Sequence, residues 1–259
     1  MRYRFEPPLR EGLVRARPNR FIMEVEVEGR MIKAHCPSTG RIGNLHFQDI
    51  PCLISMSDAP GRTTGGTVEA ISLDPEERKA KRWIGIDQGR ANDYIDHFLK
   101  QGLLASMTGG VTRIEREVRL DNSRIDFRIN GRDYVEVKTP LNMLDCSGHP
   151  QCQKTTAPFL DFERIIKHFH DIAASVGAGS RAIMLMCFLY DAPVFAPPVP
   201  DKHTVRIQDA AREAAEHGVD FWQVNLSIGR EGIDLIKCFK LALFDPIDDV
   251  LGRFEHGLG

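Results

Sequence analysis

The sequence predicts an α/β protein made of two units, a small β-barrel or curled sheet followed by an α/β core with a mixed sheet. About 80 residues at the start of the chain consist of short strand-like segments separated by turn residues. Beyond residue 89, segments with helical spacing of apolar residues alternate with strand-like segments. The chain has 259 residues, of which 42% are hydrophobic and 27% charged, which allows a sizeable core and excludes a largely disordered protein.

Turn residues divide the first unit into short antiparallel strands. Glu28-Gly29 predicts a hairpin, and 57–66, with one proline and three glycines, predicts a loop. The expected strands are Leu13–Ala16, Arg20–Val27, Arg30–Ala34, Pro51–Met56, Thr67–Leu73 and, as a further candidate, Trp83–Ile86. Four or five such strands with little helix are typical of a small barrel, which we place at residues 1–86.

The second unit, residues 87–243, alternates helices with strands. Apolar residues at helical spacing predict the helices Ala91–Leu99, Phe159–Ala173 and Val205–His217. The expected strands are Ile114–Leu120, Arg124–Asn130, Tyr134–Lys138, Ala182–Tyr190, Phe221–Ser227 and Ile233–Leu243. This order favours helices packed on a mixed sheet, and residues 244–259 form an acidic tail.

The connection at Asn130-Gly131 decides which side chains of its two flanking strands meet. A two-residue turn pairs Ile129 with Arg132 and sends the apolar side chains of the strands to opposite faces. A three-residue connection pairs Ile129 with Asp133 and gathers them on one face. Burial of four such side chains contributes about 1.5–3 kcal/mol each, more than a turn preference of about 1 kcal/mol. We therefore predict the three-residue connection.

The same register predicts a site for a divalent cation. Asp126 then lies opposite Glu136, roughly 5 Å away at Cβ, and Lys138 shares the face of Glu136. Paired carboxylates repel each other unless a cation lies between them, and such oxygen ligands suit Mg²⁺ or Mn²⁺. A bound metal would polarise a phosphoryl oxygen and acidify a water, which Lys138 would orient. The alternative is a solvated face on which Lys138 forms an ion pair with either acid.

Several segments, in order along roughly residues 5–243, resemble the sugar fermentation stimulation protein A family. They are Arg20-Phe21, His35-Cys36-Pro37-Ser38-Thr39-Gly40, Trp83-Ile84-Gly85-Ile86, Ala91-Asn92, Arg116-Glu117-Val118, Ser123-Arg124-Ile125-Asp126-Phe127 and Tyr134-Val135-Glu136-Val137-Lys138. The resemblance implies an OB-like N-terminal barrel and a restriction-endonuclease-like domain of the PD-(D/E)xK type. It also implies DNA binding and a metal-dependent nuclease site formed by Asp126, Glu136 and Lys138, with Glu117 as a further acid. The chain departs from the family pattern where the acid of a following helix falls near His97.

Nucleic acid is the expected partner, although a net charge of −2 does not by itself indicate a protein that binds nucleic acid. Residues 1–20 hold six arginines against two glutamates, and a local basic patch attracts phosphate even when the total charge is near neutral. We assign phosphate contacts to the cations Arg15, Arg17, Arg20, Arg124 and Lys167. The alternative for each is a solvated surface role.

The function predicted from these observations is a DNA-binding protein with a metal-dependent nuclease site. The alternatives are a DNA-binding regulator of sugar metabolism in which the nuclease fold is dormant, and a protein that acts on RNA. No apolar run approaches the roughly 20 residues of a membrane span, and no signal peptide is evident, so we expect a cytoplasmic protein with reduced cysteines. Cys146, His149 and Cys152 have a spacing that can hold zinc, for which Asp145 is the candidate fourth ligand. The alternatives are a disulfide and an ordinary reduced loop, and we expect the reduced loop.

Overall fold

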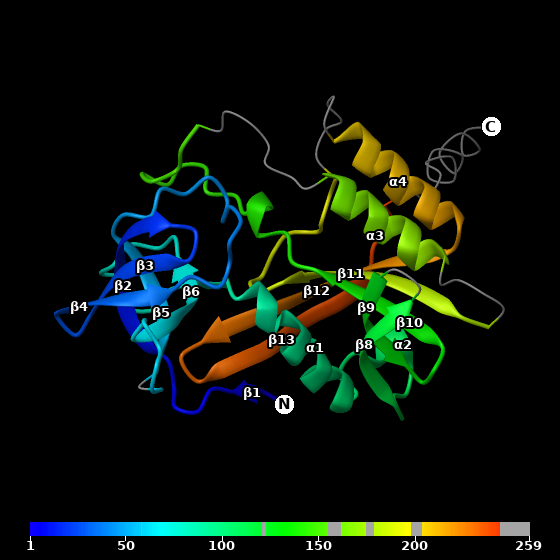
Figure 1. Cartoon of the computed structure of the whole chain (residues 1–259), viewed down its shortest axis with the longest axis horizontal. Helices are drawn as coiled ribbons and strands as arrows, with labels where there is room; N and C mark the ends of the chain where they lie inside the picture. Colours follow the sequence, from blue (N-terminus) through cyan, green and yellow to red (C-terminus); the bar gives the residue numbers. More distant parts are fainter. Residues whose placement is uncertain (58, 121–122, 155–161, 175–178, 198–203, 244–259) are drawn as a thin grey trace, which may run out of the picture.

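The computed structural model describes residues 1–57, 59–120, 123–154, 162–174, 179–197 and 204–243. It contains two sheets, one of six strands and one of seven. Figure 1 shows the six-stranded sheet at one end of the molecule and the seven-stranded sheet, with all the α-helices, at the other. No helix in these residues is long and apolar enough to cross a membrane.

The six-stranded sheet forms the N-terminal barrel. Its strands are β2 (Arg10–Asn19), β3 (Ile22–Val27), β4 (Arg30–His35), β5 (Ile50–Met56), β6 (Gly66–Ser72) and β7 (Trp83–Gly85), in the order β4-β3-β2-β5-β6-β7. A further pairing of β4 with β6 at His35 and Thr67 closes strands β2 to β6 into a barrel. The predicted Glu28-Gly29 hairpin is confirmed, because both residues have positive φ and join β3 to β4.

The seven-stranded sheet is mixed, as expected. Its strands are β1 (Tyr3–Arg4), β13 (Gly232–Lys240), β12 (Val219–Gly229), β11 (Arg181–Phe188), β10 (Asp133–Lys138), β9 (Ser123–Ile129) and β8 (Ile114–Leu120), in that order. β10, β11 and β12 run parallel, and the other neighbours are antiparallel. The predicted unit of residues 1–86 differs from this arrangement at one point, because β1 belongs to the second sheet.

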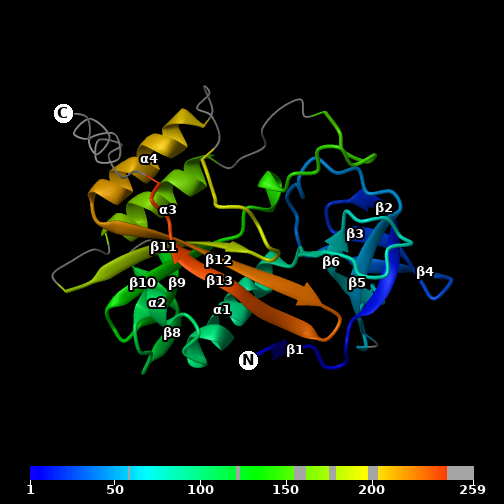
Figure 2. The same ribbon diagram turned by 180° about the vertical axis from the view of Figure 1, so that it is seen from behind.

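Helices cover both faces of this sheet. The helices are α1 (Ala91–Lys100), α2 (Ala105–Thr108), α3 (Phe162–Ala174) and α4 (Val205–Glu216), with short 3₁₀ turns at Gln88–Arg90 and Leu141–Met143. Along β11, Ile183 and Leu185 pack in the cluster that contains α1, whereas Ala182 and Met184 pack with α3 and α4. Figures 1 and 2 show these two layers from opposite sides. The helix predicted at Phe159–Ala173 corresponds to α3, and its first three residues, 159–161, lie outside the described residues.

A segment that we call the strap, residues 139–154, connects the end of β10 to the barrel. The Gly43 N–H donates to the Leu141 carbonyl, the His46 N–H donates to Gln151, and the Gln153 N–H donates to the Asn44 carbonyl, each at 2.8 Å. These backbone hydrogen bonds fix the barrel beside the carboxyl end of β10.

Candidate metal and nucleic-acid site

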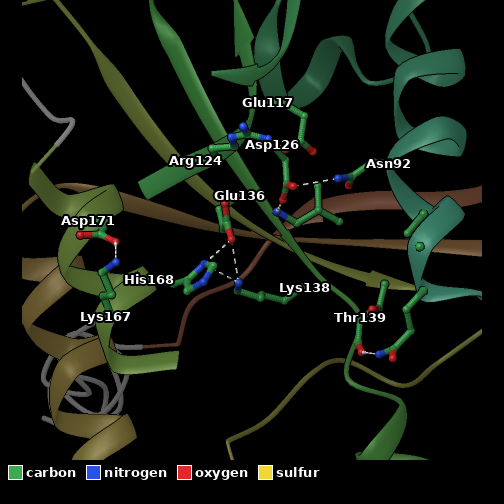
Figure 3. Close-up of a pocket in the computed structure, with 14 residues that line it drawn as sticks. Asn92, Glu117, Arg124, Asp126, Glu136, Lys138, Thr139, Lys167, His168 and Asp171 are labelled. Atoms are coloured by element: carbon green, nitrogen blue, oxygen red, sulfur yellow. Dashed lines mark hydrogen bonds and ion pairs between the residues drawn. The ribbon is translucent and has the colours of Figure 1, made fainter. Parts of the chain in front are cut away.

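A pocket of about 480 Å³ lies between β9, β10, α1 and α3. Figure 3 shows its charged side chains directed toward one another from these elements. The ionisable residues that line it are Glu117, Asp126, Glu136, Asp171, Arg124, Lys138, Lys167 and His168. The pocket therefore holds four carboxylates surrounded by basic groups.

The predicted register brings the central residues together. β9 and β10 pair Ile129 with Asp133 and Phe127 with Val135, as the three-residue connection requires. Phe127, Ile129 and Val135 are fully buried in one cluster with α1. The burial of apolar side chains on one face thus determines the register, as expected.

The ladder between β9 and β10 ends earlier than predicted. The Val137 N–H donates at 2.7 Å to Oδ2 of Asp126, a side-chain oxygen in place of a carbonyl of β9. The expected pairing of Ile125 with Val137 is wrong, because Ile125 packs in the cluster that contains α3. The pocket lies at this point of the sheet, since Asp126 and Val137 both line it.

Asp126 is held by two hydrogen bonds. Its Oδ1 accepts from Nδ2 of Asn92 on α1 and its Oδ2 from Val137, both at 2.7 Å. Burial and the nearby charge of Glu136 raise the pKa of the Asp126 carboxyl above its ordinary value. Each carboxylate oxygen can accept a further bond, so Asp126 retains the capacity to bind a cation.

Glu136 is buried, and only one of its oxygens has a hydrogen-bond partner. Oε1 accepts from Nζ of Lys138 at 2.7 Å and lies 2.5 Å from Nδ1 of His168. Burial alone would raise the pKa of Glu136, but the His168 hydrogen bond and the Lys138 charge bring it below its ordinary value. Oε2 is buried without a partner among the described residues. A buried carboxylate oxygen without a donor is rare and costly, and a divalent cation would satisfy it.

The other predicted pocket residues lie at its rim. Glu117 has a φ of 51°, in the left-handed region that non-glycine residues rarely adopt in a strand. Its carboxylate lies 3.8 Å from Nη1 of Arg124, and Nζ of Lys167 lies 3.9 Å from Oδ2 of Asp171. The rim thus presents cations beside the acidic interior.

The structure separates the three arginines that we assigned to phosphate contacts in the barrel. Arg15 forms ion pairs with Glu26 at 2.8 Å and Asp49 at 2.6 Å. Arg17 and Arg20 line a second pocket, of about 410 Å³.

Sequence reasoning did not assign Asn92, His168 and Asp171 to the site. His168 and Asp171 are three residues apart on α3 and therefore share a helix face, a spacing that could have indicated them. At the helix position where the family acid was expected, His97 packs against the ring of Tyr3 at 5.5 Å and does not line the pocket. Helix α1 contributes the Asn92 amide to this pocket instead of a carboxylate.

The cysteine and histidine run of the strap does not form a metal cluster in the structure. No group of three or more potential ligands is arranged for a metal among the described residues. The His149 Nδ1 accepts from the backbone N–H of Gln151, and the Cys146 and Cys152 sulfurs lie 2.6 Å apart. The structure therefore gives no support to a zinc site here.

Comparison with known proteins matches both units of the chain. Residues 16–86 match the SfsA N-terminal OB domain, and residues 89–232 match the sugar fermentation stimulation protein RE domain. A sugar fermentation stimulation protein homolog of Azotobacter vinelandii is 30% identical over 246 residues, covering 93% of this chain and all of the relative. A homolog of Pseudomonas fluorescens is 36% identical over 192 residues, covering 71% of this chain and 76% of the relative. The structure of Pyrococcus furiosus SfsA in complex with Ca²⁺ has a TM-score of 0.69 at 21% identity and covers 94% of this chain and 99% of that one.

Proposed function

The chain belongs to the sugar fermentation stimulation protein (SfsA) family, with an OB domain and a restriction-endonuclease-like domain, and we propose that it is a DNA-binding phosphodiesterase that requires Mg²⁺ or Mn²⁺. The observation that carries the proposal is the buried Oε2 of Glu136, which has no donor among the described residues and lies in a pocket shared with Asp126. The Ca²⁺ named for the Pyrococcus furiosus relative fits a divalent-cation site in this fold.

Asp126 and Glu136 would hold the metal, because both offer free lone pairs on hard oxygen atoms. When bound, the metal would supply Lewis-acid polarisation of a phosphoryl oxygen and acidification of a water. Asn92 and the Val137 N–H orient Asp126, and His168 orients Glu136.

Lys138 supplies a positive charge beside the reacting phosphate. Its Nζ donates to Oε1 of Glu136 at 2.7 Å, which holds the ammonium within the pocket. An ammonium held in this way stabilises the negative charge that develops on the phosphate and orients the attacking water. Arg124 and Lys167 at the rim would contact neighbouring phosphates.

The test is cleavage of labelled single-stranded and double-stranded DNA and RNA in Mn²⁺, Mg²⁺ or chelator, by the wild type and by Lys138→Ala. We expect cutting that needs metal and that falls by about 10²–10³-fold in Lys138→Ala, the range for loss of one charge-stabilising group. Lys237→Ala, which changes an exposed lysine paired with Asp191 at 3.0 Å, is the matched control.

Cleavage that persists in chelator, or that is equal in wild type and Lys138→Ala, would refute the mechanism. DNA that is bound equally by both proteins and left intact would instead favour a regulator of sugar metabolism with a dormant nuclease fold. Cutting of RNA alone would keep the mechanism and change the substrate.

A further inference from the structure

The pocket of about 410 Å³ lies where the barrel meets the strap. Its walls come from the β2–β3 turn, the loop after β4, and Gln153 and Lys154 of the strap. Arg17, Arg20, Arg41 and Lys154 line it, and no aspartate or glutamate is among its described lining residues. The pocket beside β10 holds four carboxylates among its basic groups, whereas the charged groups of this pocket are all cationic, so it is suited to an anion.

Arg17 is fixed in this pocket without a carboxylate partner among the described residues. Its Nη2 donates to the carbonyls of Ser38 at 2.7 Å and of Arg20 and Gly40 at 3.2 Å. Its guanidinium lies 5.5 Å from the ring centroid of Phe47. Because neutral groups hold Arg17, its positive charge remains available to a ligand.

A flat, exposed surface for stacking lies next to the pocket. Phe21 follows Arg20 in the β2–β3 turn and is 44% exposed, and the Arg20 guanidinium lies 4.7 Å from its ring centroid. The Asn19 side chain accepts hydrogen bonds from the Phe21 N–H at 2.9 Å and the Ile22 N–H at 3.1 Å, which fixes the turn. Exposed aromatic rings and arginine planes beside basic grooves stack unpaired bases in proteins that bind single strands.

Two hydrogen bonds connect this pocket to the carboxylate pocket. The Ser38 hydroxyl donates to Gln88 at 3.0 Å, and the Gln88 amide donates to the Thr139 carbonyl at 2.5 Å. Gln88 and Thr139 line the carboxylate pocket, whereas the two residues after Ser38 line the basic pocket. The two pockets are therefore linked through the side chain of Gln88.

We propose that the basic pocket binds the phosphates of a single-stranded segment of nucleic acid, with an unpaired base stacked on Phe21 and Arg20. If the proposed function holds, the enzyme acts on nucleic acid that has an unpaired segment and not on uniform duplex. This consequence, unlike the binding itself, rests on the proposed function. Duplex DNA keeps its base faces stacked within the helix, so only a single strand can use Phe21.

The experiment measures binding by fluorescence anisotropy in chelator, where no cleavage occurs. The probes are labelled oligodeoxythymidine of about 20 nucleotides, longer than the roughly 4–16 nucleotides that one OB domain covers, and a duplex of the same length. The proteins are the wild type, the double variant Arg20→Gln/Lys154→Gln, Phe21→Ala, and the control Arg30→Gln, which changes an exposed arginine outside the lining of this pocket.

We expect the double variant to bind the single strand at least about tenfold more weakly and to lose about 1.4 from the salt slope, since each single-strand phosphate contact contributes about 0.7. Phe21→Ala should weaken single-strand binding about fivefold or more and leave duplex binding unchanged, because base stacking contributes about 1–3 kcal/mol. Arg30→Gln should bind like the wild type. Thermal unfolding of each protein shows that the variants are folded.

Single-strand affinity of the double variant equal to that of Arg30→Gln would overturn the proposal. So would equal weakening of single-strand and duplex binding by Phe21→Ala. Binding that depends on Arg20, Lys154 and Phe21 in a protein that cuts nothing with metal would support this inference while refuting the proposed function. Metal-dependent cutting, combined with binding that is unchanged in these variants, would support the proposed function and refute this inference.

Discussion

Replacing Asp126 with asparagine should leave the metal-free protein about as stable as the wild type. Asn92 and Val137 donate to different oxygens of Asp126, and asparagine has an NH₂ group in place of one of them, so one of the two hydrogen bonds is lost in the present side-chain geometry. The lost hydrogen bond costs about 0.5–1.5 kcal/mol. Burial and the charge of Glu136 raise the pKa of Asp126, which shows that the ionised carboxylate is disfavoured there, and the neutral amide escapes this penalty. The two effects oppose each other, so we expect a net change within about 1 kcal/mol.

Divalent metal should then raise the thermal stability of the wild type but not that of Asp126→Asn. A ligand that binds only the folded state stabilises it by about 2.7 kcal/mol at a concentration of 100 Kd. For a chain of this size, 1 kcal/mol shifts the Tm by about 2–4 °C. The Tm of the wild type should therefore rise by roughly 5–10 °C in saturating Mn²⁺ or Mg²⁺, whereas that of Asp126→Asn should stay nearly constant.

The assay is thermal unfolding followed by circular dichroism during a titration of each metal, with a chelator baseline. Asp209→Asn, which changes an exposed aspartate on α4, serves as the matched control and should respond to metal like the wild type. A metal-induced rise in Tm that is equal in wild type and Asp126→Asn would refute the assignment of Asp126 as a ligand.

Two further substitutions test groups around the fold. His168→Ala should lower the rate of metal-dependent cleavage about 10–100-fold, because it removes the side chain that orients Glu136. His170→Ala, on the same helix but outside the pocket lining, should not, and an unchanged rate in His168→Ala would contradict the role. The pKa of the buried Asp74 carboxyl is held at about 2, below its ordinary 3.8, chiefly by a hydrogen bond from Arg82. Its stabilisation is present above pH 4 and is lost as the pH falls toward 2, so Asp74→Asn should cost about 1–2 kcal/mol in urea unfolding at pH 7 and much less near pH 2. A deficit that is the same at both pH values would refute this linkage.

The register of β9 and β10 could be predicted because burial of an apolar face outweighs turn preference, and the pairing of Ile129 with Asp133 follows from it. The early end of that ladder could not, because a side-chain oxygen of Asp126 replaces a backbone acceptor. Residue alternation along a strand indicates the face on which each side chain lies. It does not indicate where a side-chain oxygen will replace a backbone carbonyl as the acceptor.

The arginines of β2 illustrate a second limit. Arg15 and Arg17 are two residues apart, so regular alternation places them on one face. The β2–β3 register shifts between Val14 and Ala16 and again between Ala16 and Asn19. These irregularities turn Arg17 toward the basic pocket while Arg15 pairs with acids, and of the two only the second has a mark in the sequence, Pro18.

The contact of His168 with Glu136 joins residues 32 apart in the chain. It depends on how α3 packs over β10, which is a tertiary arrangement that a single sequence does not encode in its local periodicity. The converse holds at His97, where the sequence predicted a departure from the family pattern and where the structure places a side chain that does not line the pocket.

The pairing of β1 with β13 determines the order in which the protein can be completed during synthesis. Tyr3 and Arg4 are translated before every barrel strand, and their partners, Ile233 and Gly232, are translated after all of them. The barrel strands, from Arg10 to Gly85, are all translated in between. The barrel can therefore fold while β1 still lacks its partner strand β13. The seven-stranded sheet, in contrast, can acquire its edge strand β1 only after β13 has been translated. The barrel can therefore be completed before the second sheet is.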